Sequence, residues 1–341
     1  MLLLYYMAEL TFSEIGKVEA VNRLYEGTSF KPCATTSLEV SSKGGYARSA
    51  SRLFLEGIDF NLEYFPLKHL GYKCVIAVTG ELYAGLAHPA SLSVSLGISA
   101  KLDYAQIKEL WDGVAAAAKE QGYIQLSLQL NPSPNGLAVA VHAVGLEEKL
   151  TEKRRIGVRS KDLVCVSGSL GAAYLGLQVL ERGKSDVVKA KEDIEKYKML
   201  VGAYLKPELS DRLVGALEED ELYPSAGYFV THGLADAVKR LSRDTNLGVK
   251  IYADKIPFEG NTFSLGKELD IDPVSAAMNG GDDYKILFVI PILELEKFRR
   301  DFQTFDIIGH LALPEVGTVL VTPEGVELPM KAQGWNDWNE D

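Results

Sequence analysis

The stretch Asp162-Leu-Val-Cys-Val-Ser-Gly-Ser-Leu-Gly-Ala-Ala-Tyr-Leu-Gly-Leu-Gln-Val-Leu180 passes from a strand through a glycine turn into a helix. Its first part is rich in valine and leucine, as expected of a buried strand. Gly168 and Gly171 give the turn its backbone freedom, and a helical pattern begins after Gly171. A strand followed at once by a helix indicates a layered α/β or α+β arrangement.

The rest of the second half continues this alternation and ends in a hairpin. The hairpin turn is expected at Thr322-Pro-Glu-Gly325, because proline and glycine favour a β-turn. Helices are expected at about 188–204, 207–219 and 233–245, and strands at 248–252, 285–291 and 305–310.

The first half reads as strands with inserted helices. Residues 90–98 alternate apolar with small polar side chains, which predicts a half-buried strand. Asp103 is a suitable cap for a helix that runs to about Gln121, and Gly122 suits its end. Residues 137–144 form a further apolar strand pattern.

The length and charge pattern predict two domains. A chain of 341 residues is long enough for two, and the charged stretch 147–162 is the best boundary. We therefore expect an N-terminal domain over 1–150 and a C-terminal domain over 151–341.

Composition excludes several classes of protein. The formal net charge of −11 argues against a nucleic-acid partner, which needs a basic surface. The three cysteines have no metal-ligand spacing and indicate reduced thiols. The sequence contains no run of about 18 apolar residues, so no membrane span is expected. These features favour a cytoplasmic protein.

Several residue groups allow both a functional and a structural interpretation. The Gly168–Gly171 turn offers backbone N–H groups to a phosphate, or is simply a tight turn. Adjacent Asp282 and Asp283 suit a hard cation, or bond their own turn.

Two further groups are equally open. Glu56 and Asp59 form another carboxylate pair at the end of an expected strand. They could belong to a site, or they could simply be solvated residues at the strand end. His232 stands at an expected helix start, with no serine or cysteine placed as its partner for a catalytic triad.

A set of motifs resembles thiamine-monophosphate kinase, in that family's order from about residue 30 to 336. The motifs are Leu55-Glu-Gly-Ile-Asp-Phe60, Pro66-Leu-Lys-His-Leu-Gly-Tyr-Lys73, Ser91-Leu-Ser-Val-Ser-Leu-Gly97, Val166-Ser-Gly-Ser-Leu-Gly-Ala-Ala-Tyr-Leu-Gly-Leu177, Met278-Asn-Gly-Gly-Asp-Asp-Tyr284 and Lys331-Ala-Gln-Gly-Trp-Asn336.

This resemblance implies the two-domain fold of aminoimidazole ribonucleotide synthetase-like proteins. In that fold the N-terminal sheet forms a barrel across a homodimer, and the C-terminal domain is α/β. The implied activity is transfer of the γ-phosphoryl group of ATP to thiamine monophosphate, with magnesium ions held by aspartates. Such a reaction depends on cations that neutralise the phosphates.

Most of those acids are replaced in this chain. The family's paired N-terminal aspartates fall on Thr35 and Thr36, and the next falls on Arg52. The histidine of the Glu-Gly-Val-His-Phe motif becomes Asp59. The remaining replaced acids fall on Gln129, Ser169, Phe229 and His232.

Three implied metal positions stay acidic. Glu81 takes the place of the aspartate in a Ser-Asp pair expected to open a helix, where Gly80 replaces the serine. Asp282 and Asp283 remain, but the glutamate that usually follows the family's Gly-Gly-Glu-Asp-Tyr motif is Lys285.

We therefore expect a divergent, catalytically impaired relative, a pseudoenzyme with weak or absent magnesium binding and no assigned catalytic residue. Its cleft would serve a phosphate-bearing ligand or a partner. The alternative is an active ATP-dependent kinase that makes thiamine diphosphate. Arg52 is expected to contact phosphate directly, or else to pair with a neighbouring acid such as Glu56 or Glu81. The full set of ligand-binding candidates is Arg52, Gly168, Gly171, His232, Tyr284 and Trp335.

Overall fold

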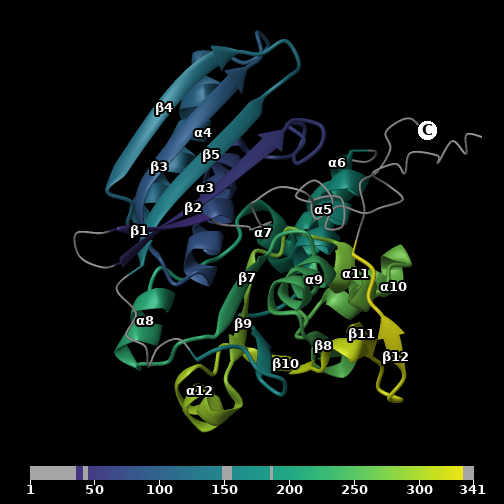
Figure 1. Ribbon diagram of the computed structural model, residues 1–341. Coiled ribbons are helices and arrows are strands. Elements are labelled where there is room, and N and C mark those ends of the chain that lie inside the picture. Colours follow the sequence, from purple (N-terminus) through teal and green to yellow (C-terminus); the bar gives the residue numbers. More distant parts are fainter. Residues whose placement is uncertain (1–35, 41–44, 148–155, 185–186, 333–341) are drawn as a thin grey trace, which may run out of the picture.

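The computed structural model describes residues 36–40, 45–147, 156–184 and 187–332, which form two β-sheets with helices packed around them (Figure 1). The first sheet has the strand order β1-β2-β5-β3-β4. Its elements are β1 (Thr36–Val40), β2 (Gly45–Leu55), α3 (Leu67–Ala84), β3 (His88–Ile98), α4 (Tyr104–Glu120), β4 (Gln125–Pro132) and β5 (Ala138–Glu147).

Helices α3 and α4 pack together and cover one face of this sheet. They approach closely, because a methyl group on Gly71 would lie 2.0 Å from the carbonyl oxygen of Leu110. Asp103 begins α4 with a capping box, in which its side chain accepts from the Gln106 N–H and the Gln106 side chain accepts from the Asp103 N–H.

The second sheet has the strand order β12-β11-β8-β10-β6-β9-β7 and is antiparallel except where β11 runs parallel to β8. Its strands are β6 (Leu163–Val166), β7 (Ala226–Val230), β8 (Gly248–Tyr252), β9 (Lys285–Ile290), β10 (Asp306–Ala312), β11 (Thr318–Val321) and β12 (Glu327–Pro329). The helices around it are α5 (Ala172–Gly183), α6 (Val187–Lys196), α7 (Lys198–Leu205), α8 (Leu213–Glu219), α9 (Leu234–Thr245), α10 (Thr262–Leu269), α11 (Pro273–Asn279) and α12 (Leu295–Asp301).

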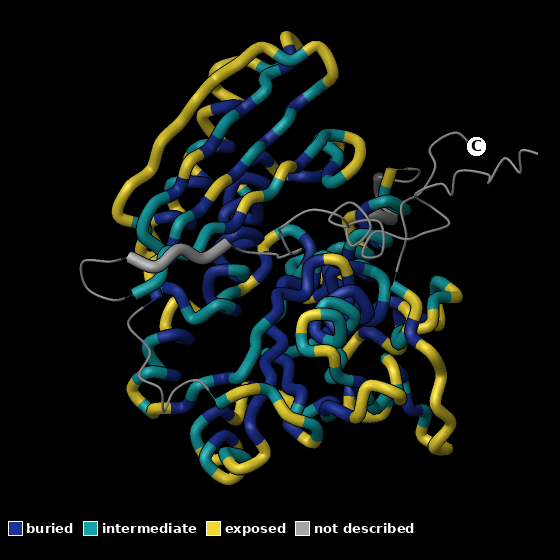
Figure 2. Tube along the Cα trace, in the orientation of Figure 1, coloured by how far each residue is buried: buried dark blue, intermediate teal, exposed yellow. Residues whose placement is uncertain are grey.

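Helix α3 joins the two parts of the molecule. One side of it packs on β2 and β5, and other residues of it contact β7, β9 and α7. It is accordingly buried along almost its whole length and only weakly amphipathic (Figure 2). A large hydrophobic cluster therefore runs from the first sheet into the second, and a separate one lies under α9.

The sequence predicted the α/β class, the strand at 90–98, the helix capped by Asp103, the strand–turn–helix unit and the C-terminal hairpin, all of which are confirmed. Other expectations were wrong. The pattern at 188–204 is divided into α6 and α7, and the helix expected at 207–219 begins only at Leu213. Gly80 and Glu81 do not open a helix, since they lie in the last turns of α3, and Gln129 lies inside β4 rather than at a strand end.

No helix of the described residues is long and apolar enough to cross a membrane. The expected domain boundary falls on residues 148–155, which lie outside the described part of the chain.

Candidate functional site

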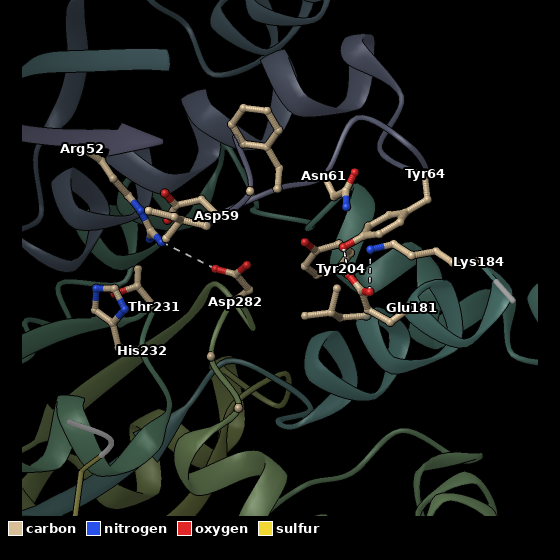
Figure 3. A pocket seen from close by; sticks show the side chains of 16 residues that line it. Arg52, Asp59, Asn61, Tyr64, Glu181, Lys184, Tyr204, Thr231, His232 and Asp282 are labelled. Atoms are coloured by element: carbon tan, nitrogen blue, oxygen red, sulfur yellow. Dashed lines mark hydrogen bonds and ion pairs between the residues drawn. The ribbon is translucent and has the colours of Figure 1, made fainter. Parts of the chain in front are cut away.

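A cavity of ≈ 370 Å³ lies where the loop after β2, helices α5 and α7, and two turns of the second sheet come together (Figure 3). Arg52, Asp59 and His232 line one end of it. Tyr64, Glu181 and Lys184 line the other, where Tyr64 donates to Glu181 and Lys184 lies 2.7 Å from the same carboxylate. The other lining residues are Gly57, Ile58, Phe60, Asn61, Leu177, Tyr204, Thr231, Gly280, Gly281 and Asp282.

Arg52 extends from β2 into the cavity wall with few partners of its own. Its guanidinium lies over the rings of Phe54, at 4.8 Å, and Tyr284, at 5.5 Å. Its Nη2 is 3.6 Å from Asp282 Oδ1, which is an ion pair but too long for a good hydrogen bond. Its Nη1 is buried and has no hydrogen-bond partner among the described residues. The guanidinium therefore retains unused donor capacity.

Asp282 is neutralised mainly by Lys73. Nζ of Lys73, a residue only 1% exposed on α3, lies 3.0 Å from Asp282 Oδ2 and 3.6 Å from the ring centroid of Tyr204. Burial raises the pKa of Asp282, but Lys73 and Arg52 outweigh it and hold the pKa below its usual value. Asp282 is thus a carboxylate paired with two cations of the chain itself.

Asp283 faces away from Asp282 and closes the start of α5. Its Oδ2 accepts from the N–H of Gly171 at 2.8 Å, and its Oδ1 accepts from the N–H of Ala173 at 3.3 Å. The N–H of Leu170 is bonded to the carbonyl of Pro257. Much of the donor capacity that the sequence assigned to a phosphate at the Gly168–Gly171 turn is therefore used within the chain.

Glu81 is also engaged by a cation. Nη1 of Arg240, on α9, lies 3.8 Å from Glu81 Oε1, and Nε of Arg240 donates to Asp236 at 2.9 Å. Burial raises the pKa of Glu81, and Arg240 offsets this effect only in part. A metal ligand must be an ionised carboxylate that is not already paired. Both the ion pair and the raised pKa therefore argue against Glu81 as a magnesium ligand.

An aromatic ring occupies the place next to Glu81. Phe229 is fully buried, and a methyl group on Gly80 would lie 2.0 Å from its Cζ atom. The ring also packs on Tyr284, with 5.6 Å between the centroids. Two positions that the family resemblance assigns to serine and aspartate thus form one apolar contact.

The remaining candidates are dispersed. Asp59 lies in the cavity wall and accepts from the Leu55 N–H at 2.8 Å, whereas its former pair Glu56 accepts from the Leu137 N–H at 2.7 Å. Gln129 is exposed on β4, the edge strand of the first sheet, and does not line the cavity. Ser169 lines a different cavity. Thr36 lies in β1, and Thr35 and Trp335 lie outside the described residues.

Magnesium, which the resemblance implies, does not fit these residues. Asp282 is paired with Lys73 and Arg52, Asp283 with backbone N–H groups, and Glu81 with Arg240. No group of three or more potential ligand side chains occurs within the described ranges. Arg52 does pair with a neighbouring acid, as the second alternative expected, but that acid is Asp282 and neither of the two named examples, Glu56 and Glu81.

Sequence reasoning missed two groups that shape this site. Lys73 was quoted only as the end of a motif, although a lysine at an apolar helix position is an unusual burial that calls for a partner. Tyr64, Glu181, Lys184 and Tyr204 had no local signal, because they meet only when the loop before α3 contacts α5 and α7.

Comparisons with known proteins agree with this fold. A thiamine-monophosphate kinase of Aquifex aeolicus is 24% identical over 69% of this chain and 73% of its own length. A putative hydrogenase expression/formation protein of Methanocaldococcus jannaschii is 22% identical over 78% of each chain. The crystal structure of thiamine monophosphate kinase from Aquifex aeolicus superposes with a TM-score of 0.76, at 20% identity, over 94% of this chain and all of that one. AaThiL complexed with AMPPCP and TMP gives 0.78, also at 20% identity, over 96% and 98%. A scan against protein-family models finds no match.

The two sheets and their helices define a protein with the aminoimidazole ribonucleotide synthetase-like fold. Within that class, the chain is similar to thiamine-monophosphate kinases, with 24% identity to that of Aquifex aeolicus and 25% to that of Pyrococcus horikoshii.

Proposed function

We propose that this protein binds a phosphate-bearing small molecule in the cavity at Arg52 without magnesium, and that it does not carry out phosphoryl transfer. The observation that carries this proposal is the state of Arg52. Its guanidinium lies in the cavity wall, its Nη1 has no acceptor among the described residues, and Lys73 already supplies the close partner of Asp282. A buried donor without an acceptor is costly, and a phosphate oxygen would satisfy it.

The charge at this end of the cavity supports the same conclusion. Arg52 and Lys73 provide two cations for the single carboxylate of Asp282. The other carboxylate nearby, Asp59, is occupied by the Leu55 N–H at 2.8 Å, and burial raises its pKa. His232 and Thr231 complete this end of the wall. A planar guanidinium can then bind phosphate directly, through its fork of donors.

Binding is tested by isothermal titration calorimetry in EDTA, with nucleotides and thiamine phosphates as ligands. We expect at least one of them to bind, and Arg52→Ala to weaken that binding by tenfold or more, which corresponds to about 1.4 kcal/mol. Arg48→Ala is the matched control, because Arg48 also lies on β2 but pairs with Glu147. Binding that requires magnesium, or that survives Arg52→Ala unchanged, would contradict the proposal.

Loss of catalysis is tested separately by incubating the protein with ATP, magnesium and thiamine monophosphate. We expect no thiamine diphosphate above background, because phosphoryl transfer depends on metal ions that neutralise the phosphates. Turnover on the order of 1 per second, at the low end for kinases, would instead establish the active kinase.

We also propose a homodimer, a cytoplasmic location and a division into two domains near residue 150. The face of the first sheet opposite α3 and α4 carries small side chains, such as Ser51, Ser93 and Ser127, which allow a second sheet to approach. Cys74 and Cys165 are free and buried, as expected of a protein in a reducing compartment.

A further inference from the structure

A second cavity, of ≈ 290 Å³, lies on the other side of the Gly280–Tyr284 segment from the first. Adjacent aspartates mark the division, since Asp282 lines the first cavity and Asp283 the second. The wall of the second cavity is formed by the turn before α5, one side of α7 and the start of β9.

Lysines surround this second cavity. Lys198 begins α7 and Lys206 follows its last residue, so that they stand roughly 12 Å apart along the helix axis. Lys285, at the start of β9, extends over the glycine turn, where its Nζ would lie 3.9 Å from a methyl group on Gly168. Lys206 and Lys285 make no ion pair with any residue in the described ranges.

The acids in the same wall do not neutralise these lysines by direct contact. Glu208 and Glu259 also line the cavity, and neither forms an ion pair within the described part of the chain. Asp283 is only 4% exposed and is directed at the backbone N–H groups of Gly171 and Ala173. The Lys206 amine lies over the ring of Tyr72, at 5.2 Å from the centroid, and this contact leaves its hydrogen-bond donors, like those of Lys285, open to a ligand.

Two sequence differences from the family pattern at this cavity also favour an anion over a cation. Ser169 and Lys285 both line it, and both stand where the family resemblance places an acid. Replacing an acid by a hydroxyl or an amine makes the wall less negative, and both new groups can donate hydrogen bonds to an anion.

We propose that this second cavity is a separate binding site for a phosphate-bearing small anion, held by Lys285, Lys206 and the Ser169 hydroxyl without a metal ion. The site goes beyond the function proposed above, because none of its lining residues belongs to the Arg52 cavity. Met199, Ala203 and Pro207 give the remaining wall an apolar part that can cover the rest of an organic ligand.

Gly202 provides a way to close this cavity without touching the other. It lies on α7 in the cavity wall, and apart from its chain neighbours and the adjacent backbone of α7 no atom lies within 4 Å of the position where its Cβ would stand. A phenylalanine there would enter the cavity, and helix propensity favours it over glycine. Gly215 on α8 has equally open space and lies in neither cavity wall, so Gly215→Phe is a matched control.

The experiment is calorimetric titration of the full chain with pyrophosphate in EDTA, in an Arg52→Ala background that removes the first site. We expect one remaining site per chain. Adding Lys285→Gln should weaken it about tenfold or more, adding Gly202→Phe should abolish it, and adding Gly215→Phe should leave it within about twofold of the background. Circular dichroism and the melting temperature of each variant establish that it is folded.

The possible results separate the two proposals. Pyrophosphate binding that disappears entirely with Arg52→Ala would overturn the second site and leave the first intact. Binding that persists in Arg52→Ala and is lost with Gly202→Phe supports the second site, even if the first proves wrong. Binding that Gly202→Phe and Lys285→Gln leave unchanged, or no binding at all in the Arg52→Ala background, contradicts the second site.

Discussion

The ring of Phe229 on β7 packs directly against Gly80 of α3, so closely that a methyl group on Gly80 would lie 2.0 Å from Cζ of the ring. This contact connects the helix that covers the first sheet to the second sheet. It fills with hydrocarbon a place where the family resemblance puts a serine and an aspartate. The sizes of the two residues therefore depend on each other.

This dependence predicts strong coupling between the two positions. Gly80→Ala should destabilise the protein by about 1–3 kcal/mol through overpacking, and Phe229→Ala by about 3–5 kcal/mol through the cavity it leaves. In the double variant, the new methyl group enters the space that the ring has vacated. We expect the double variant to lose less unfolding free energy, measured by urea denaturation, than the two single variants together, by about 0.5–3 kcal/mol. Additive losses would show that the contact is not tight.

The Lys73–Asp282 pair predicts a second coupling. Lys73→Met leaves Asp282 with only the longer contact to Arg52, and Asp282→Asn leaves a buried lysine without its carboxylate. Each change should lower the free energy of unfolding by about 3–5 kcal/mol, because it leaves a buried charge without its partner. Asparagine is the suitable replacement, since residue 282 has a φ of 60°, which asparagine tolerates.

The double variant distinguishes a buried ion pair from two independent effects. Lys73→Met with Asp282→Asn removes both charges and should regain much of the loss in urea denaturation. Lys108→Met with Asp112→Asn is the control, because that pair lies on the surface of α4 and is expected to contribute less than about 1 kcal/mol. Equal behaviour of the two pairs would contradict the burial argument.

The proposed dimer predicts a specific sensitivity of the first sheet. Ser93 lies exposed on β3, with its hydroxyl 3.0 Å from that of Ser127 on the neighbouring strand. Ser93→Arg places a charge in the middle of the open face and should convert the dimer to a monomer at micromolar concentration in analytical ultracentrifugation. Thr304→Arg, an equally exposed position beyond α12, should leave the dimer intact. A wild-type monomer at this concentration would refute the dimer.

Glu268 predicts how stability depends on acid pH. The hydroxyl of Tyr197 donates to its carboxylate at 2.7 Å, with Lys196 and Arg182 beside it, and these contacts lower the pKa of Glu268 to about 2. A carboxyl whose folded pKa is lowered stabilises the fold above its unfolded pKa, and that contribution is lost as the pH falls from about 4.5 towards 2.

Glu268→Gln should therefore reduce stability at neutral pH and flatten the acid limb of the urea-denaturation profile. Because the carboxylate is partly exposed, salt should screen the effect. Glu324→Gln is the comparison, since the low pKa of Glu324 arises from Thr322 and local backbone only, without contacts between helices. Identical acid limbs for wild type and Glu268→Gln would show that the network contributes nothing.

Much of this fold follows from local sequence. The capping box at Asp103 and the hairpin turn at 322–325 use short-range hydrogen bonds, and the turn at 168–171 uses the positive φ angles that its two glycines adopt. The sequence pattern did not predict helix α3, and the reason is physical. It is contacted on several sides, so it lacks the polar face by which an amphipathic helix is recognised.

The sequence by itself determined the family resemblance and the loss of acids at positions such as Arg52, Ser169 and His232. Only the tertiary structure decided what became of the acids that remain. Asp282 is paired with Lys73, which is 209 residues away in the chain, Asp283 caps α5, and Glu81 faces Arg240. Ionic contacts across such separations depend on how α3 packs between the two sheets, and local sequence carries no record of that packing.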